Sequence, residues 1–265
     1  MLSKIKADSI PIKEFEEYNL EEMHIILSRS FQYDGIVNLK KDIPEEILDR
    51  VYIVSITNIF LKMISSAGEI ELEKNLVLPD RYIKQIVALP IIDELYTDPD
   101  SHREYSEESD SEIIMFLKEF CSAAALTQIV SGKMSLTSLG TSLIADKNEL
   151  LKLLMYHVFV KGIIPNIYST PFSYYSHFGS AFTLILISIY GDKSEKFEQY
   201  FNKYFAAFPF VLDFFKKVTE SAFTKKVMAD SYLLIVFKST LRYFNFIDKV
   251  QHLGEEKLVV KSNIF

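Results

Sequence analysis

Residues 133–144 read KMSLTSLGTSLI, a β-like run that ends at Thr137 and is followed by Gly140 and a short apolar stretch. We expect the Thr137 hydroxyl to cap the following helix by accepting a hydrogen bond from the amide of Gly140. Because glycine lacks a Cβ, Gly140 would let this short helix lie close to its neighbour. The stretch therefore predicts a joint between a strand and a helix.

The segments before this joint predict a helix and then a hairpin. In SEIIMFLKEFCSAAAL, apolar side chains recur at helical spacing, as at Ile113, Phe116, Leu117 and Phe120. The next segment, TQIVSGKMSLT, places the turn dipeptide Ser131-Gly132 between β-forming residues, a pattern typical of a hairpin.

Three segments share one order of features: an amphipathic helix, a short β-like passage, and Lys, Thr or Ser leading onward. They are residues 59–79, 115–140 and 236–265. The first two also share the letters FLK and, a few residues later, SA. Repeated supersecondary units would explain this pattern, and chance similarity of short segments is the alternative.

The run Leu136-Thr137-x-x-Gly140-x-x-Leu143 after a two-stranded wing resembles the end of a winged-helix domain. The alternation of such units with aromatic helices also resembles regions of bacterial proteins related to a plasmid-borne open reading frame. The C-terminal segment resembles a second wing, although LVVKSNIF lacks the glycine, and residues 59–79 match less well. Winged helices bind DNA, bind proteins or serve as scaffolds, so the resemblance implies a fold and leaves the function open.

The expected fold class is mainly α, with two or three winged-helix-like units that carry short β-hairpins. An aromatic-rich helical insertion is expected between the second and third units. The low content of glycine and proline, 8 residues of each, favours long helices, including one from about Glu45 to Ala67.

Composition suggests three regions along the chain. Residues 1–96 form an N-terminal helical, winged-helix-like region, and residues 97–111, TDPDSHREYSEESDS, form an acidic linker or loop. Residues 112–265 form a winged-helix-like and aromatic-rich helical region.

Charge and cysteine content limit the class of protein. The net charge is −7, composed of −11 in residues 1–110 and +4 in residues 111–265, which argues against a dedicated nucleic-acid binder. A single cysteine and no apparent secretory signal predict a cytoplasmic protein. The most apolar stretch, residues 181–190, is about half the ~20 residues that a spanning helix needs, so no membrane association is expected.

A weak basic face is the main candidate for nucleic-acid binding. Its members are Lys133, Lys216, Lys217, Lys225, Lys226 and Arg242. Such side chains could neutralise phosphates without reading base sequence, and the alternative is that they solvate the outer faces of helices. Arg242 is the only arginine after residue 110, which argues against base-edge recognition.

Catalytic chemistry finds little support in the sequence. The five histidines are widely separated, and none stands at metal-ligand spacing with a second histidine or cysteine. Cys121 lies on an apolar helical face, and His177, in SYYSHFG, is better explained by packing. We therefore predict no catalytic residues, no metal and no cofactor, and an enzyme is the least supported hypothesis.

Two functions remain. The first is a non-catalytic binding protein that engages nucleic acid or another protein through its C-terminal half. The alternative is a structural scaffold or oligomerisation module, with a possible homo-oligomer formed through the aromatic helices of residues 195–210, EKFEQYFNKYFAAFPF. Aromatic residues at helical spacing more commonly pack inside a protein, and they would mark an interface only if exposed together.

Overall fold

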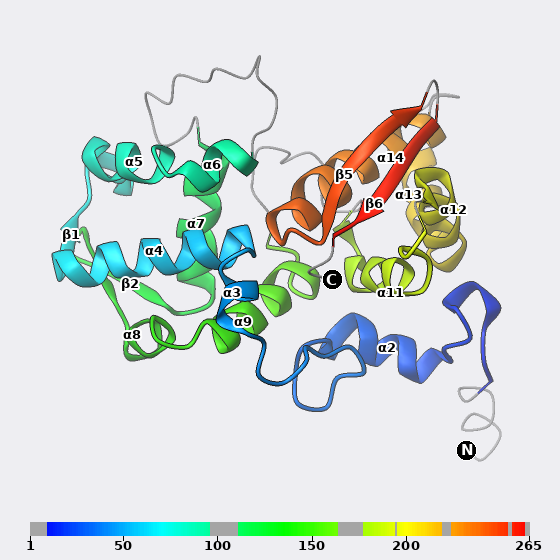
Figure 1. Cartoon of the computed structure of the whole chain (residues 1–265), viewed down its shortest axis with the longest axis horizontal. Coiled ribbons are helices and arrows are strands. Elements are labelled where there is room, and N and C mark those ends of the chain that lie inside the picture. The colour runs from blue at the N-terminus through cyan, green and yellow to red at the C-terminus, as the bar shows by residue number, and fades with distance from the viewer. Residues whose placement is uncertain are drawn as a thin grey trace. The chain divides into compact units, whose positions relative to one another are not determined.

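The computed structural model of the chain describes residues 10–95, 111–163, 177–193, 195–218, 224–253 and 256–262. The chain divides into two compact units. The central unit holds Lys41–His157 and Ile163–Ile167, and the terminal unit holds Met1–Lys40, Val158–Gly162 and Tyr168–Phe265. As expected, the structure is mainly helical with small antiparallel sheets (Figure 1).

The central unit contains helices before and after the strands of a small sheet in chain order. Its elements are α3 (Glu45–Leu48), α4 (Tyr52–Ala67), β1 (Glu69–Glu71), η2 (Lys74–Leu76), α5 (Asp80–Val87), α6 (Pro90–Leu95), α7 (Glu112–Ala123), β2 (Thr127–Val130), β3 (Lys133–Leu136), α8 (Ser138–Leu143) and α9 (Lys147–Phe159), whose last two residues belong to the terminal unit.

The central sheet is antiparallel with the order β1-β3-β2. The hairpin β2–β3 was predicted, and its register places Ile129 opposite Met134. The third strand was not predicted to pair here: β1 lies beside β3, with Ile70 opposite Met134. This pairing joins residues on both sides of the acidic segment proposed as a linker, of which residues 97–110 lie outside the described part of the chain.

The joint between β3 and α8 has the predicted structure. The Thr137 hydroxyl accepts a hydrogen bond of 3.0 Å from the amide of Gly140 and donates one of 2.7 Å to the carbonyl of Ala125. A Cβ on Gly140 would lie 2.1 Å from the carbonyl oxygen of Leu126. Only glycine therefore allows α8 to approach the start of the hairpin this closely.

The single helix expected over residues 45–67 is wrong, because the chain bends between α3 and α4. Val51 is extended at the N-cap of α4, and the Ser55 hydroxyl donates to the carbonyl of Asp49 across the bend. Both Leu48 and Val51 are buried by this geometry. Burial of two apolar side chains at the bend offsets the helical hydrogen bonds that are lost there.

The terminal unit begins with an N-terminal segment and continues after α9. Its elements are η1 (Lys13–Phe15), α2 (Leu20–Arg29), α11 (Ser180–Tyr190), β4 (Glu195–Lys196), α12 (Phe197–Ala207), α13 (Pro209–Val218), α14 (Thr224–Tyr232), the π-helical η5 (Leu233–Leu241), β5 (Ile247–Leu253) and β6 (Glu256–Lys261).

The terminal sheet has the order β4-β6-β5 and is also antiparallel. Its hairpin β5–β6 (orange to red in Figure 1) lies in the C-terminal segment, where the sequence predicts a short β-hairpin. The short strand β4 pairs with β6, with Lys196 opposite Leu258. Both units therefore contain a helix, a strand, further helices and two strands in that order, and in both the third strand lies in the middle of the sheet.

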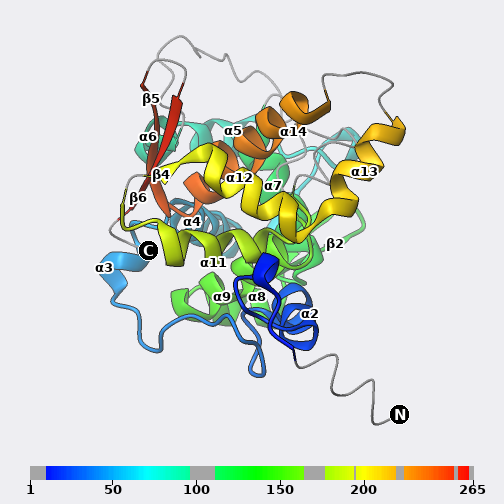
Figure 2. The same ribbon diagram turned by 90° about the vertical axis from the view of Figure 1, so that its right-hand side faces the viewer.

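Aromatic side chains form the core of the terminal unit. The rings of Tyr204 and Tyr232 stack with centroids 4.5 Å apart, and the Tyr232 hydroxyl shares a hydrogen bond of 2.7 Å with Thr183. Helix α12 packs against α11, α13 and α14 (Figure 2). The aromatic residues of α12, including Phe197 and Phe201, are buried, which favours interior packing over a contact surface for oligomerisation.

A hydrogen bond and an ion pair attach the N-terminal segment to the rest of the terminal unit. The sequence Asn19-Leu20-Glu21-Glu22 predicts a capping box at the start of α2, and both of its hydrogen bonds form at 2.9 Å. The Glu16 carboxylate accepts hydrogen bonds from the Tyr190 hydroxyl and, at 2.7 Å, from the Lys203 ammonium. These contacts hold η1 against α11 and α12.

Candidate functional site

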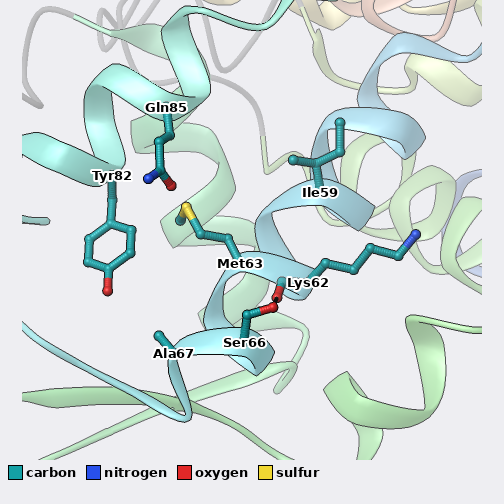
Figure 3. A pocket seen from close by; sticks show the side chains of 7 residues that line it. All are labelled: Ile59, Lys62, Met63, Ser66, Ala67, Tyr82 and Gln85. Carbon is teal, nitrogen blue, oxygen red and sulfur yellow. Dashed lines mark hydrogen bonds between the residues drawn. The ribbon is translucent and has the colours of Figure 1, made fainter.

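An open groove between α4 and α5 is the best candidate for a binding site in the central unit. Its volume is about 440 Å³. The residues lining it are Ile59, Lys62, Met63, Ser66, Ala67, Tyr82 and Gln85. Figure 3 shows that α4 contributes one wall and α5, through Tyr82 and Gln85, the other.

Apolar side chains at four-residue spacing form the wall on α4. Ile59, Met63 and Ala67 lie one turn apart, and Ile59 is 38% exposed although the opposite face of α4 is buried in the core. A helical spacing of four places these side chains in one row along the groove. The groove therefore presents apolar surface that the described residues leave partly exposed.

The polar groups around the groove are mainly engaged with their own helices. The Ser66 hydroxyl donates to the carbonyl of Lys62 at 2.9 Å, and the Lys62 ammonium points away from Tyr82 (Figure 3). On α5, the Arg81 guanidinium lies 4.7 Å from the centroid of the Tyr82 ring and donates to its hydroxyl at 3.1 Å. The groove wall is thus largely apolar, with the Gln85 amide as a polar group at one side.

A second pocket of about 230 Å³ near the start of α9 is lined by a cluster of ion-paired residues. Lys147 donates to Glu45 at 2.9 Å and to Asp49 at 2.5 Å, and these hydrogen bonds to Asp49 and Glu45 raise the pKa of its ammonium. The Asn148 amide is bonded to both backbone groups of Ile43. Because these polar groups bind one another, we interpret them as structural contacts that hold α3 and α9 together.

The predicted basic residues are divided between the two units. Lys133 stands beside the hairpin turn as expected, and it forms an ion pair of 3.1 Å with Glu69 on β1. It belongs to the central unit, whereas the other five residues belong to the terminal unit. The side chains of Lys216 and Lys217 in α13 lie outside the described part of the structure.

The remaining three basic residues lie on the helix formed by α14 and η5. Lys225 and Lys226 are exposed at its start, where the Lys225 ammonium lies 5.8 Å from the centroid of the Phe201 ring. Arg242 follows η5, and its guanidinium donates to the carbonyl of Asp248 at 2.8 Å. Several proposed phosphate-binding groups therefore already contact other parts of the chain.

His177 and Ser180 form a buried, hydrogen-bonded pair in the terminal unit. Nδ1 of His177 and the Ser180 hydroxyl share a hydrogen bond of 3.2 Å, and both residues are buried. Burial lowers the pKa of His177 to about 3, so the imidazole is neutral at physiological pH. Its Nε2 is buried without a hydrogen-bond partner in the described structure. The pair is therefore part of the buried interior of the described terminal unit.

Cys121 is also a core residue, as expected from its apolar helical face. It is fully buried, and burial raises the pKa of its thiol, which keeps it protonated and unreactive. Within the described ranges, no cluster of three or more His, Cys, Asp or Glu side chains could hold a metal ion. Over the same residues, no helix combines the length and apolar character needed to cross a membrane.

Two features of the surface were not found from the sequence. The groove was missed because Ile59, Met63 and Ala67 read as part of an ordinary amphipathic helix, and only the position of α5 leaves them uncovered. The exposed residues Lys226, Leu234 and Lys238 on α14 and η5 were missed because the sequence does not show which face of this helix its neighbours leave uncovered. Comparison with protein-family models, curated proteins and solved structures finds no match to this chain.

Proposed function

We propose that this chain is a non-catalytic protein-binding protein built from two winged-helix-like units. The shared order of helices and strands supports the assignment, together with the Thr137–Gly140 joint after the first wing. In this scheme β2–β3 and β5–β6 are the wings, and α4 and α11 are the first helices. The aromatic helices α11 and α12 then belong to the second unit instead of forming an insertion.

The groove between α4 and α5 carries the proposal of protein binding. Exposed apolar surface commonly marks an interaction site, and here Ile59 and Ala67 are exposed with the half-buried Met63 between them. Residues Ile59, Met63 and Ala67 offer the spacing with which two helices pack. We propose that an amphipathic helix of a partner protein places its apolar side chains in this groove, with the Gln85 amide as a polar contact.

Site-specific crosslinking tests this proposal. A photoreactive amino acid replaces Ile59 in the groove, and a matched probe replaces the exposed Ser142 on α8 in the same unit. We expect a discrete protein partner to crosslink from position 59 and not from position 142.

Two charge substitutions on α4 provide the control. Met63→Glu places a carboxylate in the groove, whereas Ser65→Glu adds the same charge to an exposed position of the helix that does not line it. The crosslink should be lost in the first variant and retained in the second, with circular dichroism showing that both are folded. Identical products from positions 59 and 142, or a crosslink that survives Met63→Glu, would contradict the proposal.

Nucleic-acid binding is a second candidate, favoured by the exposed pair Lys225 and Lys226 at the start of α14. If this pair contacts phosphates, generic duplex DNA should bind at low salt, and log K should fall linearly with log salt concentration. The variant with both lysines changed to alanine should show a smaller slope. Absence of binding at low salt would eliminate this candidate and leave the protein-binding proposal unaffected.

A further inference from the structure

An exposed row of residues follows the continuous helix formed by α14 and η5. The row contains Lys226, Asp230, Leu234, Lys238 and Arg242, one residue in every four. All are exposed except Arg242, which is half-buried, while Met228, Tyr232, Val236 and Thr240 on the opposite side are buried.

The spacing of four keeps this row on one face because η5 is π-helical. An α-helix turns once in ~3.6 residues, and a π-helix, with hydrogen bonds to the fifth residue, has a wider turn. The buried Thr240 hydroxyl donates at 2.8 Å to the carbonyl of Ile235, five residues earlier. Positions four apart drift slightly one way in the α-helical α14 and slightly the other way in the π-helical η5, so the row stays on one face.

The two charges next to Leu234 in the row have opposite signs and are equally spaced from it. Asp230 lies one turn before this leucine and Lys238 one turn after it, each about 6 Å away along the axis. When two copies of the helix cross antiparallel at Leu234, Asp230 of each copy lies opposite Lys238 of the other. A two-fold axis repeats every contact, so a contact between Asp230 of one copy and Lys238 of the other occurs twice.

We propose that a second copy of this chain binds along this row and forms a two-fold symmetric dimer. The 40% exposed side chain of Leu234 packs on its symmetry mate at the centre. Two Asp230–Lys238 ion pairs flank it, within reach at the usual interaxial distance of ~8–10 Å. This contact is separate from the groove on α4, so it does not depend on the proposed protein partner.

The ends of the row limit the strength of this dimer. Lys226 and Arg242 would approach each other about 12 Å from the crossing point, where the two helix axes diverge. The Arg242 guanidinium is directed at the carbonyl of Asp248, which draws it toward its own chain. A single helix pair buries less than the ~1,200 Å² of a typical stable interface, so we expect a dissociation constant on the order of 10–100 µM.

Charge exchange across the row gives a specific test by sedimentation. The wild-type chain, at about 0.15 M salt to screen its net charge of −7, should rise from the monomer mass of 30.7 kDa toward twice that value as concentration increases. In a dimer of the Asp230→Lys variant, the new lysine of each copy would face Lys238 of the other. In a dimer of the Lys238→Asp variant, the new aspartate of each copy would face Asp230 of the other. Each variant should weaken association by on the order of 10–100-fold.

The mixture of these variants decides whether the geometry is right. In a mixed dimer, the lysine introduced at position 230 faces the aspartate introduced at position 238. The unchanged Lys238 of the first variant faces the unchanged Asp230 of the second. Equimolar mixing should therefore restore association, as should the double exchange in one chain.

Folding of the variants is controlled separately. Both substituted positions are exposed, and circular dichroism confirms that each variant is folded. A wild type that stays monomeric at about 200 µM, or variants that do not regain association on mixing, would overturn the proposal.

Discussion

Replacement of Gly140 by alanine tests the joint between the hairpin and α8. A Cβ at this position would lie 2.1 Å from the carbonyl oxygen of Leu126 and 2.9 Å from its carbonyl carbon. Because close carbon–oxygen contacts are normally ~3.3 Å or longer, α8 and the hairpin must separate by about 1 Å. The displacement would also stretch the hydrogen bond of 3.0 Å from the Thr137 amide to the carbonyl of Leu126.

The magnitude follows from three contributions. Overpacking of a tight contact costs ~1–3 kcal/mol, and weakening one hydrogen bond costs about 1 kcal/mol. Alanine offsets ~0.5–1 kcal/mol of this through its higher helix propensity. We therefore expect Gly140→Ala to lower the free energy of unfolding of the central unit by about 2 kcal/mol.

Cys121 provides a local assay for this prediction. It is the only cysteine of the chain and is buried in the central unit, so its reaction with a thiol reagent reports unfolding of that unit. With a urea m-value of about 2 kcal/mol/M, the midpoint of labelling should fall by about 1 M.

Ser138→Ala is the matched control for Gly140→Ala. Ser138 is exposed on the same helix, and its replacement should change stability by less than ~0.5 kcal/mol. The reasoning is refuted if the urea midpoint of Gly140→Ala equals or exceeds that of the wild type. Helix propensity alone, without the close contact at Leu126, would give that result.

Three further predictions concern capping, burial and charge. Asn19→Ala removes the capping box of α2 and should cost about 1 kcal/mol in thermal unfolding, whereas an unchanged melting temperature would show that the cap is unimportant. His177 binds a proton in the unfolded chain near pH 6.5 but in the folded chain only near pH 3, so stability should fall as pH drops between these values, and His177→Gln should reduce this slope. Lys147→Met should destabilise the central unit by about 1 kcal/mol at neutral pH, and because the ammonium pKa is raised in the folded chain, the difference from wild type should shrink only above pH ~10.5. A Lys147→Met effect that is already lost at pH 9 would contradict this cause.

Local signals explain what could be predicted from the sequence. The Ser131-Gly132 turn, the Thr137 cap and the Asn19 capping box each depend on residues only a few positions apart, and all have the predicted form. The C-terminal hairpin was also recognisable, because its two β-like runs are longer than four residues and adjacent.

Interactions between distant residues explain what was missed. Strands β1 and β4 have three and two residues, too few for a periodic signal, and each pairs with a strand more than 60 positions later. The candidate sites have the same limitation. The sequence identifies Ile59 and Lys226 as residues of amphipathic helices, but whether they are covered depends on which elements pack beside them.

The central claim is that the two units share one sheet topology. In each sheet, the second strand of the hairpin lies in the middle, between the first strand of the hairpin and a short strand that comes earlier in the chain. In the terminal unit this claim depends on the pairing of β4 with β6. Lys196 lies opposite Leu258, and both side chains are at least partly exposed. Cysteines at paired positions of antiparallel strands are close enough to form a disulfide, whereas a shift of one residue directs the side chain to the other face of the sheet.

The decisive measurement is therefore the oxidation of two double-cysteine variants, followed by mass analysis under non-reducing conditions. The account predicts that the variant with Lys196→Cys and Leu258→Cys forms an intramolecular disulfide, while the variant with Lys196→Cys and Val259→Cys does not. Equal oxidation of both variants, or of neither, would contradict the predicted register and, with it, the equivalence of the two units.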